Sequence, residues 1–190
     1  METKTSRDSP IRLDRVVPEN AAKGWVAVTL APGKQTMGTY NFWNRDLYED
    51  LAMLRALGTT LLVSLLTDYE LSKLKIPNLV EAAHQRELVV LRHPIEDGSV
   101  PTDMKRFMFI VQRICRQYEL GWRIVVHCNG GLGRAGMVAA CVRLALGLDE
   151  NPAQAIAVVR QIRSERAIET QEQSRFIEEF RRRPLPRLPF

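Results

Sequence analysis

Continuous apolar runs alternate along this 190-residue chain with segments in which apolar residues recur every three or four positions. Apolar runs predict buried strands, and the three-to-four spacing predicts amphipathic helices. Strands are expected at residues 59–66, 88–91 and 123–127, with shorter candidates at residues 11–16 and 25–30. Helices are expected at residues 44–58, 81–86, 102–119, 134–147, 152–163 and 170–182.

Local signals mark the ends of two of these helices. Asn44 is the expected N-cap of the first, which Gly58 closes, and Thr102 or Asp103 caps the helix that runs to about Glu119. Because strands alternate with helices, the chain is expected to form a single α/β domain: a mostly parallel central sheet flanked by helices on both faces. In such sheets, ligands bind at the carboxyl ends of the strands.

The strand at residues 123–127 runs directly into Cys128, and a glycine-rich turn then leads to Arg134, which opens the next helix. Backbone N–H groups of such a turn converge on an anion, and the helix dipole favours negative charge there. The same field favours a thiolate, so Cys128 is expected to be nucleophilic near neutral pH. Arg134 can hold two oxygens of one phosphate.

The pattern therefore predicts covalent attack of Cys128 on a phosphate monoester. A nucleotide-binding turn without chemistry is the alternative, and the strand before and the helix after favour catalysis. Two kinds of group are expected to hold the phosphate. One is the backbone of the turn and the other is the Arg134 side chain, so the phosphate-binding residues are Asn129, Gly130, Gly131, Leu132, Gly133 and Arg134.

The loop at residues 93–101 follows another predicted strand, so it is expected at the same sheet edge as Cys128. Cleavage by a thiolate needs an acid that protonates the departing oxygen. Asp97 followed by Gly98 favours an exposed, mobile turn, which suits an acid that closes over substrate. Asp97 could instead only cap the turn, and Glu96 is a rival carboxylate. We favour Asp97 as the acid.

Roles are also predicted for one further segment, two histidines and two cysteines. The segment from Glu169 to Gln173 opens a helix and could orient the attacking water. His93 and His127 are expected to support loops by hydrogen bonds rather than to shuttle protons. Cys115 and Cys141 lie in predicted helices and are expected to be small core residues, as free cysteines commonly are.

Charge and composition limit the class of partner. The net charge is +5, but residues 181–190 hold four arginines and no acid, which leaves 27 − 4 = 23 basic against 22 acidic side chains in residues 1–180. This near-neutral body argues against a broad nucleic-acid-binding surface. The polar start argues against a signal peptide, and no apolar stretch reaches membrane-spanning length. No metal or cofactor is expected, and a nucleophilic thiol predicts a cytoplasmic location.

The site residues together resemble a known family. His127-Cys128, five residues and Arg134, with His93-Pro94-Ile95 and Asp97 upstream, are similar to cysteine-dependent dual-specificity protein phosphatases of the kinase-associated (cyclin-dependent-kinase-inhibitor-3) type. The similarity continues through residues 71–79 and 167–173 and covers roughly residues 25–180. A phosphatase domain is therefore expected at residues 23–182, between a loosely held arm at residues 1–22 and a tail rich in Pro and Arg at residues 183–190.

The resemblance also implies roles for single residues. Cys128 would be the nucleophile, Arg134 the phosphate clamp, Asp97 the general acid and Gln173 the water-orienting glutamine. Two positions depart from the pattern. Ala135 stands where most relatives have Ser or Thr, whose hydroxyl stabilises the leaving thiolate, and Glu169 stands where many tyrosine phosphatases have glutamine.

The expected substrate is a phosphorylated protein or peptide, with phosphotyrosine and phosphoserine or phosphothreonine both accepted. The turn at residues 129–133 lacks the Lys or Arg often used for polyphosphorylated lipids, and no tyrosine-rich segment indicates a deep pocket for phosphotyrosine alone. An RNA 5′-phosphatase of the same fold is one alternative, and a phospho-binding module with weak turnover, suggested by Ala135, is another. The sequence names no regulatory partner.

The last residues alternate proline with leucine after three arginines. Arg183, Pro186 and Pro189 fit the spacing of a polyproline ligand for an aromatic groove. A frayed, solvated terminus is the preferred interpretation.

Overall fold

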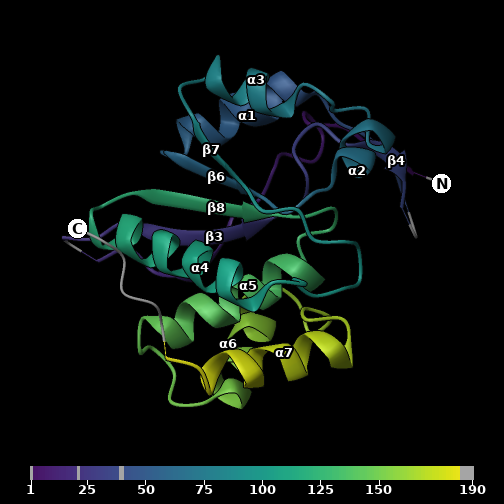
Figure 1. Cartoon of the computed structure of the whole chain (residues 1–190). Coiled ribbons are helices and arrows are strands. Elements are labelled where there is room, and N and C mark those ends of the chain that lie inside the picture. Colours follow the sequence, from purple (N-terminus) through teal and green to yellow (C-terminus); the bar gives the residue numbers. More distant parts are fainter. Residues whose placement is uncertain (1, 21, 39–40, 185–190) are drawn as a thin grey trace.

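A five-stranded sheet forms the centre of the computed structural model, which describes residues 2–20, 22–38 and 41–184 (Figure 1). Its strand order is β2-β3-β8-β6-β7. Only β2 runs antiparallel to its neighbour, so the predicted mostly parallel sheet is confirmed. The strands are β2 (Asp14–Val17), β3 (Trp25–Thr29), β6 (Leu61–Ser64), β7 (Val89–Arg92) and β8 (Arg123–His127).

Helices cover both faces of this sheet, as predicted (Figure 1). One face carries α1 (Leu47–Ala56) and α3 (Leu79–His84), and the other carries α4 (Met104–Glu119), α5 (Gly133–Ala145), α6 (Pro152–Ile162) and α7 (Gln171–Arg181). Side chains of β8 alternate between the two apolar cores, because successive residues of a strand point to opposite faces. Ile124 and Val126 join the core beneath α4 to α7, whereas Val125 joins the core beneath α1 and α3.

A second, three-stranded sheet was not predicted. It has the order β1-β5-β4 and consists of β1 (Glu2–Lys4), β5 (Asn41–Asn44) and β4 (Gln35–Met37). These strands are short and partly exposed, so they lack the apolar run by which the buried strands were recognised. Because Asn44 belongs to β5, its assignment as N-cap is wrong. Asp46 caps α1 instead, and its side chain accepts a hydrogen bond from Glu49 N at 2.8 Å.

The arm expected at residues 1–22 is not loosely held in its second half, where the short strand candidate at residues 11–16 overlaps β2. β2 is an edge strand of the central sheet, and Val16 and Val17 are fully buried against the core. The short apolar run predicted a strand here, but it did not reveal that this strand pairs at the edge of the central sheet. The predicted polyproline segment at residues 183–190 lies, from residue 185 onward, outside the described residues.

Helix α2 (Asp68–Lys73) completes the edge at which the parallel strands end (Figure 1). Thr67 and Glu70 form a capping box at its start, and its last turn is tied to β4 by a hydrogen bond from Gln35 N to Leu74 O of 3.0 Å. Across residues 2–20, 22–38 and 41–184, no helix is both long and apolar enough to cross a lipid bilayer.

Candidate functional site

Cys128 lies directly after β8, with only 3% of its surface exposed, and the turn to Arg134 curls around it. The carbonyl oxygens of the turn are bound on its outer side. Asn129 O accepts from Ala31 N at 3.1 Å, and the oxygens of Gly130 and Gly131 accept from the Arg163 guanidinium at 3.0 Å each. In a trans peptide the N–H points opposite to the carbonyl of the same plane. The amides of residues 130–132 are therefore directed inward, as an anion cradle requires.

Gly131 allows this tight turn. Its φ is +69°, in the left-handed region where a side chain is strained, and a Cβ at this position would collide with the backbone oxygen of Thr29. The turn thus rests against the end of β3 with no room for a side chain. The glycine that the sequence pattern picked out is required by the geometry.

Arg134 sits beneath the turn, 1% exposed, and donates to five acceptor atoms, of which Leu65 O is the most distant at 3.5 Å. Its Nη1 and Nη2 donate to the two carboxylate oxygens of Glu70 at 2.7 Å each, Nη1 also donates to Ile95 O at 2.7 Å, and Nη2 donates to Asp97 Oδ1 at 2.6 Å. Its Nε is buried and has no partner within the part of the chain that the structure describes. Both Nη atoms are thus engaged, and Nε–H is the donor of Arg134 that remains for a further anion.

The opposite charges of Glu70 and Arg134 keep both side chains ionised. Burial alone raises the pKa of Glu70, but hydrogen bonds from Arg134 and Thr67 outweigh it and hold that pKa below its usual range. Burial likewise opposes the charge on Arg134, yet the bond to Glu70 and the field of Cys128 raise the pKa of Arg134. The guanidinium is thus a permanent cation, as a phosphate clamp needs.

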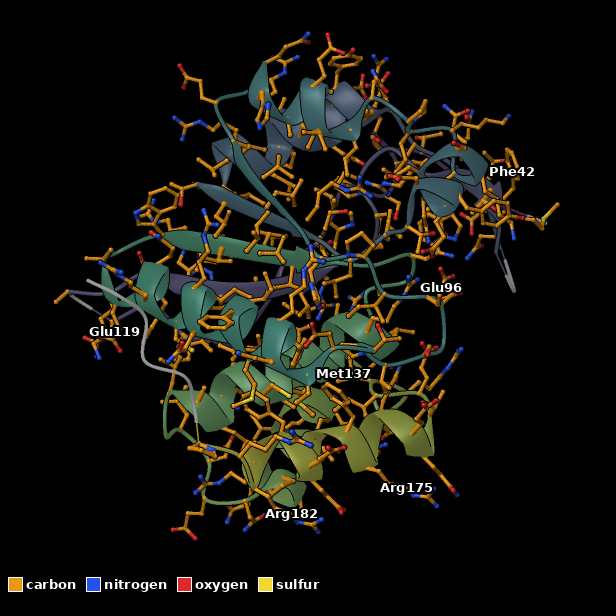
Figure 2. All side chains as sticks on the ribbon, viewed as in Figure 1. Phe42, Glu96, Glu119, Met137, Arg175 and Arg182 are labelled. Atoms are coloured by element: carbon orange, nitrogen blue, oxygen red, sulfur yellow. The ribbon has the colours of Figure 1, made fainter. Side chains whose placement is uncertain are left out.

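Asp97 and Glu96, the two candidate acids, differ in what they touch. The side chain of Asp97 is 66% exposed but reaches Arg134. The side chain of Glu96 projects from the loop (Figure 2), forms no hydrogen bond or ion pair with a described residue, and lines a surface groove next to Asp97. The loop itself turns back through a hydrogen bond from Ser99 N to Glu96 O of 3.1 Å. Of these two loop carboxylates, Asp97 is therefore the one that the fold brings to Arg134.

Gln173 and Glu169 stand against the other side of the turn. A Cβ added to Gly133 would lie 2.5 Å from Glu169 Oε2 and 3.0 Å from Gln173 Nε2. Gln173 is fully buried; its Oε1 accepts from Glu169 N at 3.0 Å and its Nε2 donates to Ser99 O at 3.3 Å. Both residues named as water-positioning candidates thus lie against the turn. Gln173 also ties α7 to the loop at residues 93–101, which is called the acid loop below.

The histidines do not form the loop-supporting hydrogen bonds expected of them: both ring nitrogens of His127 and Nε2 of His93 are buried without a partner among the described residues. Burial lowers the pKa of His127 to about 4, so its imidazole is neutral at physiological pH. Burial also lowers the pKa of His93, which packs beside Phe107 with ring centroids 5.9 Å apart. Burial raises the pKa of Cys115 to about 12 and that of Cys141 well above its usual range, which leaves both as unreactive thiols.

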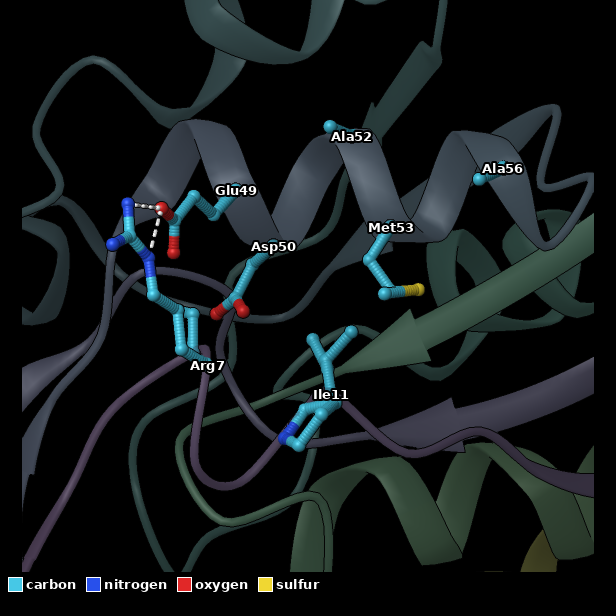
Figure 3. Close-up of a pocket in the computed structure, with 9 residues that line it drawn as sticks. Arg7, Ile11, Glu49, Asp50, Ala52, Met53 and Ala56 are labelled. Carbon is cyan, nitrogen blue, oxygen red and sulfur yellow. Dashed lines mark hydrogen bonds and ion pairs between the residues drawn. The ribbon is translucent and has the colours of Figure 1, made fainter.

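A hollow on the surface adjoins the site. A groove of about 390 Å³ opens between β4, α2 and the acid loop, and Asn129 and Asp97 form part of its lining together with Met37, Tyr69 and Lys73. Met37 and Tyr69 are 64% and 72% exposed. A second cavity, of about 550 Å³, lies between α1 and the N-terminal segment, where Arg7 pairs with Glu49 (Figure 3). None of the predicted site residues lines that cavity.

Sequence reasoning missed three charged residues of this site. Glu70 anchors Arg134, Arg163 binds two turn carbonyls, and the Lys34 ammonium lies 3.1 Å from Asn129 O. Glu70 had a signal that could have been used, because its capping box follows β6 and so places α2 at the same sheet edge. Lys34 and Arg163 are about 95 and 32 residues distant from their acceptors, and no local pattern links them.

Comparison with known proteins agrees with this geometry. The family model for Cyclin-dependent kinase inhibitor 3 matches residues 22–156. The Cyclin-dependent kinase inhibitor 3 proteins of Sus scrofa and Homo sapiens are 35% and 34% identical over 137 residues, which make up 72% of this chain and 64% of each relative. The chain thus spans just under two thirds of the length of these relatives.

Solved structures show the same fold. One is a kinase associated phosphatase that was crystallised with its catalytic-site cysteine replaced by serine. It superposes on this chain with a TM-score of 0.81 at 29% sequence identity, and the match covers 91% of this chain and 95% of the phosphatase chain. Tk-PTP in its active form gives a TM-score of 0.70 at 26% identity, over 90% of this chain and 97% of its own. With a family match over most of its length and this fold, the chain belongs to the cyclin-dependent kinase inhibitor 3 family.

Proposed function

We propose that this protein is a phosphatase that cleaves phosphate monoesters through a phosphocysteine intermediate. The observation that carries the proposal is the arrangement around Cys128: inward-facing amides of the turn and a fixed guanidinium of Arg134 surround the thiol, with Asp97 bonded to that guanidinium. Amides and guanidinium stabilise the negative charge of the transferring phosphoryl group in a site that needs no rearrangement. The resemblance to known phosphatases supports the same reaction.

The reaction then takes two steps. In the first, the Cys128 thiolate forms a bond to phosphorus while the bond from phosphorus to the leaving oxygen breaks, and Asp97 gives that oxygen its proton. In the second, a water oriented by Gln173 and Glu169 attacks phosphorus and passes its proton to Asp97. The sulfur–phosphorus bond breaks, and inorganic phosphate and the thiolate are released.

The substrate class we propose is a phosphorylated protein carrying phosphotyrosine or phosphoserine and phosphothreonine. The groove beside Asn129 supports a polypeptide, since its exposed Met37 and Tyr69 can pack against residues that flank the phosphorylated one. The near-neutral body weighs against an RNA 5′-phosphatase. The cytoplasm is the proposed location, because the reaction needs a reduced thiol.

Tyr69→Ala tests whether the groove reads a polypeptide. Removing this exposed ring should raise KM for phosphopeptides roughly threefold to tenfold while KM for a small aryl phosphate stays unchanged. Tyr48→Ala is the matched control, because Tyr48 is also exposed but lies on α1 and does not line the groove. Equal KM values for wild type and Tyr69→Ala on several phosphopeptides would show that the groove does not bind substrate.

Ala135→Ser tests the second step. The residue is fully buried in the first turn of α5, directly after Arg134, and offers the sulfur no donor. A hydroxyl there would donate to the sulfur as its charge returns, a bond worth roughly 1.5–3 kcal/mol. Since about 1.4 kcal/mol is tenfold in rate, the variant should raise the steady-state rate by one to two orders of magnitude.

The time course checks this account of Ala135. Wild type should release a burst of alcohol followed by a slower steady state, and the burst should diminish in Ala135→Ser. A linear wild-type time course with no gain in the variant would mean that Gln173, Glu169 or the amides already compensate. A phospho-binding module without turnover would show neither phase.

A further inference from the structure

Lys34 is a buried cation that the reaction above leaves without a role. It follows β3 in the turn through Gly33 and is only 5% exposed. Lysine is almost never buried unless its charge has a partner, because removing an ammonium from water is costly. The contacts of Lys34 should therefore reveal what its charge serves.

Those contacts converge on the first residue of the phosphate turn. Lys34 Nζ lies 3.1 Å from Asn129 O and 3.4 Å from Asn129 Oδ1, and it sits over the ring of Trp43 at 4.8 Å from the centroid. These partners are neutral. Across residues 2–20, 22–38 and 41–184, Lys34 forms no ion pair with a carboxylate.

The negative charge that Lys34 faces is that of Cys128. Burial lowers the pKa of Lys34 to about 8, the Cys128 thiolate acts in the opposite direction, and the cations Arg45 and Arg163 lower it further. These three groups are the charges that bear on Lys34 from the ends of β8, β5 and α6. An ammonium and a negative charge placed this way attract each other, so the charge of Lys34 also acts on an anion held by the turn.

Lys34 and Arg163 together complete the outer support of the turn. Lys34 binds the carbonyl of Asn129, while Arg163 binds those of Gly130 and Gly131, so three consecutive peptides are held by two cations. Each held carbonyl turns the following amide inward. Lys34 thus acts on an anion twice, through the orientation of the Gly130 amide and through its own charge.

We propose that Lys34 is a positioning residue of the phosphate site, whose ammonium fixes the peptide between Asn129 and Gly130 and strengthens the binding of an oxyanion. This inference rests on the proposed function, since it assumes that the turn binds phosphate. It makes oxyanion binding depend on the protonation of Lys34. Below about pH 8 the ammonium is present, and as the pH rises through this value the charge and the support are lost.

The experiment measures tungstate affinity in Cys128→Ser across about pH 6.5 to about pH 9 by calorimetry. Tungstate stays a dianion over this range, serine removes the thiol beside Lys34, and the neighbouring arginines remain charged. Since the thiolate no longer raises the pKa of Lys34, the transition should fall at or below about pH 8. Affinity should drop roughly fivefold to fiftyfold from the acidic to the alkaline limit.

Variants in the same background separate position from charge. Lys34→Met should bind roughly fivefold to fiftyfold more weakly at the acidic limit and show no pH dependence. Lys34→Arg should lose the pH dependence but keep binding at alkaline pH, because its charge persists. Lys23→Met is the matched control, since Lys23 is also a lysine beside β3 but pairs with Glu119 on the surface.

The outcomes are distinguishable. Lys34→Met that binds tungstate as tightly as the parent, or a pH dependence that survives in Lys34→Arg, overturns the inference and leaves the proposed function standing. A parent that binds no tungstate at any pH overturns both. If Lys34→Met does not fold, the comparison of the parent with Lys34→Arg still decides.

Discussion

Cys128→Ser should abolish turnover, with kcat reduced by at least about 10⁴-fold, yet still bind an oxyanion. A serine hydroxyl is a far weaker nucleophile than a thiolate, so the covalent step fails. The amides of the turn and the guanidinium of Arg134 do not depend on the sulfur, because their support comes from Arg163, Glu70 and Ile95. Hydrolysis of a phosphotyrosine peptide, followed with tungstate titration, checks both parts.

Cys115→Ser is the control for this result. Cys115 is a second free thiol, partly buried in α4 and remote in sequence from the turn, and burial leaves it unreactive. This variant should hydrolyse the peptide at the wild-type rate. Appreciable activity in Cys128→Ser, or equal losses in both variants, would contradict a mechanism centred on Cys128.

Asp97→Asn should lower kcat for phosphopeptides on the order of 10²–10⁴-fold, the usual contribution of a positioned general acid. The loss should shrink for aryl esters whose leaving groups need no proton, because the acid then has nothing to supply. The side chain contacts Arg134 at 2.6 Å, so some loss of binding can accompany the loss of rate. Comparing the two kinds of substrate separates the two effects.

Glu96→Gln supplies the matched comparison, as the neighbouring carboxylate on the same loop. It projects from the loop (Figure 2) and lines the groove without reaching Arg134, so kcat for both kinds of substrate should stay within about twofold of wild type. If Glu96→Gln shows the dependence on leaving group and Asp97→Asn does not, the acid is Glu96. The loop would then have to rotate to bring it to the phosphate.

The sequence predicted those parts of the fold that depend on short-range patterns. The long amphipathic α4 begins at the N-cap Asp103 and β8 occupies residues 123–127, as expected, because caps and apolar runs are local signals. The small sheet was missed, since β4 and β5 are short and partly exposed. Edge strand β2 was underestimated for a related reason: its burial comes from pairing with β3, which a single strand does not reveal.

The same distinction applies to the site. The nucleophile, the turn and the clamp lie within seven consecutive residues, so their mutual geometry follows from one strand–turn–helix unit. The residues that hold this unit come from elsewhere: Glu70 from α2, Arg163 from the end of α6 and Lys34 from the turn after β3. Their roles arise only when the parallel strands bring their carboxyl ends to one edge, which the sequence does not display residue by residue.

The central claim is that phosphate passes through a covalent bond to Cys128. The most direct test mixes wild type with excess phosphotyrosine peptide, quenches in acid within milliseconds, and analyses the digested chain by mass spectrometry. Since Ala135 offers the leaving sulfur no hydrogen bond, the intermediate should accumulate. We expect a phosphoryl group on the proteolytic fragment of the enzyme that contains Cys128. This phosphoryl group should disappear when the substrate is exhausted. Steady hydrolysis without any phosphorylated Cys128 at any quench time would contradict it.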